Sequence, residues 1–101
     1  GPVHQATRPI QIDASAAAQL TPESRASIAS FLETLRGLDD WSVTALDAAA
    51  RAFAEAQGLK LGKVAQPLRA ALTGRTVSPG IFEVMVLIGK EESLARLADQ
   101  A

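Results

Sequence analysis

The chain has 101 residues and is nearly neutral, with ten Lys or Arg side chains against eleven Asp or Glu side chains. This length allows one small domain with a modest core, too small for the nested architecture of most catalytic pockets. Cysteine is absent and histidine occurs once, which excludes disulfides, thiolate catalysis and Cys or His clusters around a metal. We therefore expect no metal site and no cofactor in this chain, and a cytoplasmic location fits the lack of cysteine.

The hydrophobic residues make up 48% of the chain, but many of them are alanine. Aromatic and β-branched residues, which favour strands, are sparse. The composition therefore predicts an all-α fold. No stretch approaches the roughly 20 apolar residues that span a bilayer, and the N-terminus lacks a signal-peptide pattern. We expect no association with a membrane.

Residues 1–20 show little periodicity and are predicted to form an irregular lead-in that can include a short helical turn. Gly1-Pro2 looks like the scar left when a protease removes an expression tag, so we interpret the chain as a piece of a larger protein. His4 lies in this segment, where a solvent-exposed imidazole is much more common than a general base. We expect the helical domain to occupy 21–101, with 21–40 alternatively belonging to a preceding helical subdomain.

The rest of the chain repeats the start and stop signals of helices. Starts are marked by Ser or Thr, twice followed by proline, and Ser78 is expected to cap the fourth helix. Glycines mark the ends, and apolar residues recur every three or four positions between them. Pro67 lacks a backbone donor, so we predict a short turn there and a helix that begins near it. The expected fold is a compact bundle of about five short helices, at 22–36, 43–57, 67–73, 79–88 and 90–100.

Few residues have the character of a catalytic group. Asp39-Asp40 precedes a predicted helix and Glu91-Glu92 begins one, and negative charge at these positions favours the positive end of the helix. No P-loop or dinucleotide fingerprint is present. We therefore expect no catalytic residue in this chain.

The aromatic residues are better explained by packing than by stacking on nucleic acid bases. Trp41 directly precedes a helix start, where a hydrophobic staple against Leu46 is the favoured interpretation. Phe82 and Met85 share one helical stripe, which is typical of a core. Any base contact would therefore depend on arginine, backbone groups and small apolar side chains.

One segment of the chain is strongly basic, because every charged side chain between Glu55 and Glu83 is positive. Gly and Pro place this segment at helix ends, which suits the binding of a phosphate backbone and of unpaired bases. Arginine can donate in a fork to a base or phosphate, whereas lysine acts as a point charge. By charge alone, a solvated face is more common, and a helical protein-interaction module is the alternative function. The cations of this basic run are Lys60, Lys63, Arg69 and Arg75.

Four ordered blocks in the second half of the chain carry a more specific signal. They are Gly58-Leu-Lys-Leu-Gly-Lys-Val-Ala-Gln-Pro-Leu-Arg69, Ala71-Leu-Thr-Gly-Arg75, Ser78-Pro-Gly-Ile-Phe-Glu83 and Gly89-Lys-Glu91. In residue type and spacing the stretch 41–97 closely resembles the C-terminal region of bacterial glutamyl-tRNA synthetase. Residues 8–36 look like the more variable helical segment that precedes it.

The resemblance implies an α-helical anticodon-binding domain attached to a class I catalytic domain. In this family the catalytic domain activates glutamate with ATP and Mg and transfers it to tRNA(Glu). Its His-rich signature and Lys-Ser loop have no counterpart in this chain, which should be inactive alone. The implied partners are the anticodon loop of tRNA(Glu) and the catalytic domain of the parent polypeptide. The alternative is a parent that also charges tRNA(Gln).

Matched motif by motif, the resemblance places the anticodon contacts on Arg69 and on the turn that contains Ser78, Pro79 and Ile81. Pro79 and Ile81 would offer an apolar ledge to a flipped base, and Arg69 would reach that base or its phosphate. Weaker candidates, assigned from charge and location, are Arg75, Gln66, Lys60 and Lys63.

A purely structural interpretation of the same residues stays open at this point. Ser78 and Pro79 can serve as a helix cap alone. Arg69 can pair with Glu83 or Glu55 across the surface of the domain.

Overall fold

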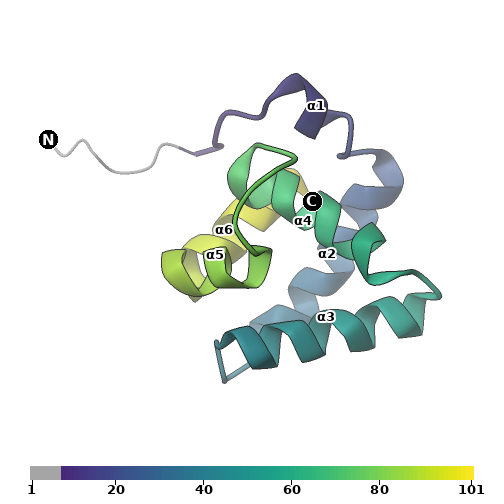
Figure 1. Ribbon diagram of the computed structural model, residues 1–101, viewed down its shortest axis with the longest axis vertical. Helices are drawn as coiled ribbons and strands as arrows, with labels where there is room; N and C mark the ends of the chain where they lie inside the picture. Colours follow the sequence, from purple (N-terminus) through teal and green to yellow (C-terminus); the bar gives the residue numbers. More distant parts are fainter. Residues whose placement is uncertain (1–7) are drawn as a thin grey trace, which may run out of the picture.

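The computed structural model describes residues 8–101, and all regular secondary structure in this range is helical. Figure 1 shows α4 in the middle of the bundle, with α3 crossing below it. The predicted all-α fold is confirmed, with the four-residue helix α1 added to the five expected helices. His4 and Gly1-Pro2 lie outside the described residues. The helices are α1 (Ala14–Ala17), α2 (Pro22–Arg36), α3 (Val43–Gln57), α4 (Leu61–Thr73), α5 (Ile81–Ile88) and α6 (Lys90–Gln100).

The helices α2 and α3 have the predicted bounds because their end signals are local. Thr21 Oγ1 accepts a hydrogen bond from the Ser24 amide at 3.1 Å, which caps α2. Ser42 Oγ accepts one from the Ala45 amide at 3.2 Å and caps α3. Each bond satisfies an amide that the first helical turn leaves without a partner.

The break predicted at Pro67 is wrong, because α4 runs through it from Leu61 to Thr73. Proline removes one bond from the helix ladder, which normally destabilises a helix interior. Here the ring of Pro67 is buried, as are Val64 and Leu68 on the same helix. Burial of this apolar face compensates for the missing bond, so α4 presents one continuous surface to solvent.

Ser78 does not cap α5, contrary to the prediction. The N-cap is Gly80, with no side-chain hydrogen bond, and the helix begins at Ile81. Ser78 Oγ instead donates to the Pro79 carbonyl oxygen at 2.7 Å and accepts from Arg69. A contact with a residue nine positions earlier has therefore replaced the local cap.

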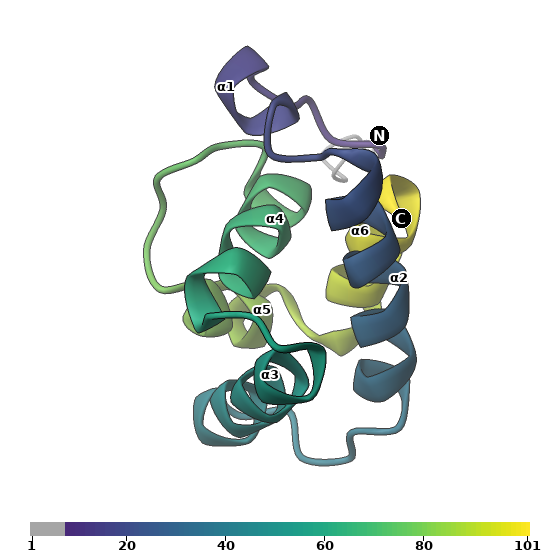
Figure 2. The same ribbon diagram turned by 90° about the vertical axis from the view of Figure 1, so that its right-hand side faces the viewer.

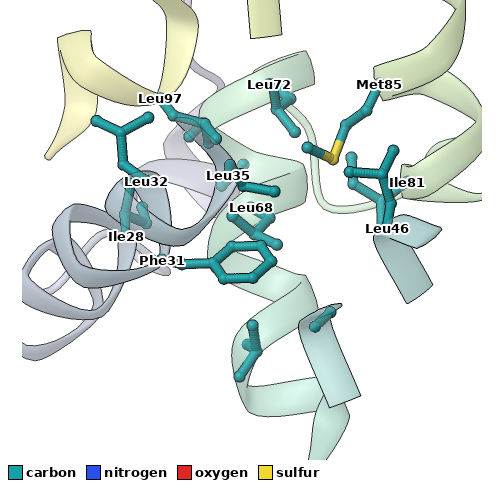
Figure 3. Packing of buried hydrophobic residues seen from close by; sticks show 14 of the residues in the cluster. Ile28, Phe31, Leu32, Leu35, Leu46, Leu68, Leu72, Ile81, Met85 and Leu97 are labelled. Carbon is teal, nitrogen blue, oxygen red and sulfur yellow. The ribbon is translucent and has the colours of Figure 1, made fainter. Parts of the chain in front are cut away.

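The hydrophobic core lies between α2, α4, α5 and α6, and Leu46 adds to it from α3. Figure 3 shows the labelled side chains converging, with Met85 and Ile81 close to Leu46. The rings of Phe31 and Phe53 lie 5.1 Å apart between centroids and join α2 to α3. Met85 is fully buried and Phe82 packs against the core, which confirms the packing role predicted for both.

The Met85 carbonyl oxygen joins three parts of the chain. It accepts hydrogen bonds from Trp41 Nε1 at 2.9 Å, from Ser93 Oγ at 3.2 Å and from the Gly89 amide at 3.0 Å. Trp41 is half-buried and packs against the core, so it is no free platform for a base. This cluster fixes the corner between α5 and α6 against the start of α3.

Three cations bind the carbonyl oxygens left unpaired where helices end. Lys90 Nζ donates to the Leu38 carbonyl oxygen at 2.8 Å, just beyond α2, and lies 5.8 Å from the Trp41 ring centre. Arg96 Nη1 donates to the Leu72 carbonyl oxygen at 2.8 Å near the end of α4. Arg25 Nη1 donates to the carbonyl oxygen of the last residue of α6 at 2.8 Å. Positive charge at these ends also favours the helix dipole.

In the described part of the lead-in, residues 11–17 pack on the end of α4. The Asp13 amide donates to the Gly74 carbonyl oxygen at 2.8 Å, and α1 contacts α4. Gly74 has a φ of +73°, and a Cβ built there would lie 2.1 Å from the Gln11 carbonyl oxygen. Glycine is therefore required by both the backbone angle and the close approach of the lead-in.

The substitutions Gly74→Ala and Gly58→Ala separate these two requirements. Gly58 has a similar φ of +71°, but a Cβ there meets nothing within 4 Å. We expect Gly58→Ala to lower the free energy of unfolding by about 1 kcal/mol through the backbone angle alone. Gly74→Ala should lose about 1–3 kcal/mol more through overlap with the lead-in. Urea denaturation followed by circular dichroism measures both, and equal losses would contradict the docking of residues 11–13.

Candidate nucleic-acid interface

Among residues 8–101, six of the ten Lys and Arg side chains have an anionic or backbone carbonyl partner. Four of these form ion pairs, and the other two bind carbonyl oxygens at helix ends. The remaining four form no ion pair among residues 8–101, so the pairing of Arg69 with Glu83 or Glu55 is wrong. They are Lys60, Lys63, Arg69 and Arg75, the complete basic run.

The structure brings Arg69, Gln66, Ser78 and Pro79 together. Arg69 Nε donates to Ser78 Oγ at 2.9 Å, and Arg69 Nη1 donates to Gln66 Oε1 at 3.4 Å. Both partners are neutral, so the positive charge of the guanidinium is uncompensated. The remaining donors of its planar fork are suited to a phosphate or a base edge.

Ile81 does not contribute a surface contact, because its side chain is 3% exposed and packs in the core. Figure 3 shows it among the buried side chains beside Met85. The apolar ledge expected from Pro79 and Ile81 is therefore corrected. Pro79 is exposed, and the other exposed apolar side chain near it is Val77, which is 80% exposed.

Sequence reasoning missed Val77 because an isolated valine in an aperiodic loop gives no signal of its own. Its exposure matters here only because its neighbour Ser78 is bonded to Arg69. Figure 2 shows the loop between α4 and α5 extending away from the helices.

Arg75 lies on the exposed start of this loop and is not among the side chains bonded to Arg69. The side chain of Arg75 forms no hydrogen bond or ion pair within the described residues, but its backbone amide is hydrogen-bonded to Thr73. Thr73 Oγ1 donates to the Arg69 carbonyl oxygen at 2.7 Å and accepts from the Arg75 amide at 3.1 Å. Thr73, which sequence reasoning also missed, therefore fixes where the loop leaves α4.

The residues Lys60, Lys63 and Gln66 lie on a separate part of the surface, in a groove of about 490 Å³. The opposite wall comes from the end of α1 and the start of α2, including Thr21 and Ser24. Gln66 belongs to both places, since it also accepts the bond from Arg69. The candidates therefore form two neighbouring groups joined at Gln66.

The sequence matches the model of a known protein family along nearly the whole chain. The model of the anticodon binding domain covers residues 4–101. The chain belongs to the anticodon-binding domain family. The prediction made from the four sequence blocks is confirmed.

The relatives of this anticodon-binding domain are glutamate–tRNA ligases. That of Bradyrhizobium sp. (strain ORS 278) is 64% identical over 96 residues, which are 95% of this chain and 20% of that protein. Glutamate–tRNA ligase 1 of Brucella melitensis biotype 1 is 56% identical over 95 residues, 94% of this chain and 20% of that protein. A crystal structure of a glutamate tRNA ligase from Elizabethkingia meningosepticum has a TM-score of 0.83 and 31% identity, covering 91% of this chain and 18% of that one. The chain thus spans about one fifth of the length of the curated relatives it matches.

Within 8–101 no three His, Cys, Asp or Glu side chains are grouped as metal ligands. None of the helices described is long and apolar enough to cross a membrane.

The bond between Arg69 and Ser78 should couple the loop to α4 energetically. We expect Ser78→Ala and Arg69→Gln to be non-additive, with a coupling free energy of about 1 kcal/mol, because both remove the same charge-assisted hydrogen bond. A double-mutant cycle on urea denaturation measures the coupling. The pair Ser30→Ala and Arg69→Gln is the matched control and should be additive, since Ser30 is exposed on α2. Additivity of the first pair would contradict the bond.

Proposed function

We propose that the domain reads the anticodon loop of tRNA(Glu) for a glutamate–tRNA ligase. The observation that carries this proposal is the set of four cations that have neither a carboxylate nor a backbone carbonyl partner within 8–101, all in the basic run. Folding explains the other six cations through ion pairs and helix ends. A phosphate-rich partner would supply the missing negative charge.

The Arg69 group, Arg69 with Gln66, Ser78 and Pro79, is the proposed base reader. Its donors face a loop whose exposed apolar side chains are Val77 and Pro79. RNA readers commonly bind unstacked loop bases by combining such donors with apolar or planar contacts. The domain would thus supply discrimination between tRNAs and no bond chemistry.

The remaining four fifths of the parent would carry the catalytic domain, with the ATP and Mg that activate glutamate. Linked to that domain, a weak anticodon contact would gain from high effective concentration on the same tRNA. We place this parent in the cytoplasm. The affinity of the isolated domain for RNA should accordingly be low and should fall as salt is added. For a single-stranded loop, the slope of log K against log salt should be about −0.7 for each phosphate that is neutralised.

Replacement of Arg69 tests the proposed base reader. We expect Arg69→Ala to weaken binding of a tRNA(Glu) anticodon stem-loop by about 1–3 kcal/mol and to reduce discrimination against a scrambled loop of equal length. Arg51→Ala is the control with the same charge change, since Arg51 is exposed on α3 and pairs with Asp47 at 2.9 Å. Fluorescence anisotropy measures both RNAs. Equal binding of the two loops by the original chain would contradict anticodon reading and favour a general basic face.

The two tRNA identities are separated by the same assay. A tRNA(Gln) stem-loop that binds as tightly as the tRNA(Glu) stem-loop would indicate a parent that also charges tRNA(Gln). A clear preference for tRNA(Glu) would support the narrower function.

Substitution of Val77 tests the apolar contact. Val77→Thr keeps the side-chain shape but adds a hydroxyl, so a base packed on it should bind about threefold to tenfold more weakly. Val86→Thr, on α5 at 39% exposure, is the control. Stem-loops carrying 2-aminopurine at single loop positions report which base is affected. An unchanged affinity and fluorescence at every position would contradict a contact with Val77.

A further inference from the structure

We propose that the groove between α4 and the start of α2 holds a sugar–phosphate segment of the same RNA, separately from the base that the Arg69 group reads. This inference rests on the proposed function. It assigns RNA binding to two places on one surface. The groove would position the RNA, and the Arg69 group would read its sequence.

The charge of the groove favours an anion. Its volume is about 490 Å³, and its lining holds two exposed lysines and no acidic side chain. Glu23 lines a neighbouring hollow of about 300 Å³, which shares Lys63 with the groove. Neither lysine forms an ion pair within 8–101. The residues of the lining are Ala18, Gln19, Thr21, Ser24, Lys60, Gly62, Lys63, Gln66 and Pro67.

Gly62 leaves the wall of the groove open. It lies in α4, where glycine is less favourable than alanine, and its φ is not positive. A Cβ built on it meets nothing within 4 Å, so packing within the described residues does not require glycine. The missing side chain leaves the groove wall open to close approach by a backbone from outside.

Gln66 makes the groove continuous with the Arg69 group. Lys63, Gln66 and Arg69 follow one another at intervals of three residues on α4, and Lys60 is the N-cap of that helix. Each interval turns by about 60° around the helix axis, so Gln66, which lines the groove and also bonds to Arg69, is the residue that joins the two places. From Lys63 to Arg69 the helix rises about 9 Å, a distance that a stacked strand advancing about 3.4 Å per nucleotide covers in about three nucleotides. One RNA segment can therefore reach both places.

The first test removes the two lysine charges. We expect Lys60→Gln with Lys63→Gln to weaken binding of the tRNA(Glu) stem-loop and of the scrambled loop by the same factor. The slope of log K against log salt should fall by about 1.4, or about 0.7 for each lysine. The matched control, Arg36→Gln with Arg51→Gln, removes two charges that are paired with Glu33 and Asp47. This control should leave the slope nearly unchanged.

The second test fills the groove without disturbing the core. Gly62→Glu adds a carboxylate where the chain leaves space, in the first turn of a helix, where acids are favourable. We expect the urea midpoint to stay the same or rise and RNA binding to fall at least tenfold. Ala48→Glu, which makes the same charge change at an exposed position of α3, should bind within about twofold of the original chain.

The outcomes distinguish this inference from the proposed function. If the chain prefers the tRNA(Glu) loop but both groove variants bind like their controls, the groove carries no RNA and the base reader stands. If neither loop binds the original chain, the proposed function itself fails. If a poly-glutamate peptide binds through the same lysines as tightly as the stem-loop, the groove is a site for acidic protein segments and the RNA assignment is overturned.

Discussion

The position of α4 constrains everything else in this domain. It packs against each of the other five helices of the described part, and Val64, Leu68 and Leu72 bury its inner face. Its outer face carries Lys63, Gln66 and Arg69. A rotation of the helix that moved one of these groups relative to the RNA would also disrupt the core, so packing fixes the geometry of the proposed interface. This constraint also explains why Pro67 is accommodated within the helix.

The distribution of charge follows from the same architecture. Short helices leave many carbonyl oxygens unpaired at their ends, and Arg25, Lys90 and Arg96 bind these oxygens. Acids pair with Arg8, Arg36 and Arg51, which leaves the four cations of the basic run without an acid partner among residues 8–101. One surface is therefore basic although the chain as a whole is nearly neutral. Net charge alone therefore gives no indication of nucleic-acid binding, whereas the partners of each cation do.

The sequence correctly predicted the helices whose ends are set by neighbouring residues. It gave wrong predictions where contacts between distant residues determine a helix start or the burial of a side chain. The bounds of α2 and α3 follow from Thr21 and Ser42, whose hydroxyls act within one turn. Ser78 also has a hydroxyl that could cap a helix, but this hydroxyl accepts a hydrogen bond from Arg69. The N-cap of α5 is therefore Gly80. Burial of Ile81 likewise depends on how α5 packs. The groove could not be predicted, because its walls come from segments about 40 residues apart.

The loop between α4 and α5 is anchored at both ends and exposed between them. At its start, Thr73 binds the Arg75 amide and Gly74 accepts the Asp13 amide. At its end, Ser78 is held by Arg69. Only the few residues between these anchors need to change conformation when a base binds. The rest of the loop is already held in place before binding. Because ordering of flexible segments opposes association, an anchored loop retains more of its contact energy as affinity. The contact of Asp13 with Gly74 therefore supports the proposed binding site, since without it one anchor of the loop would be lost.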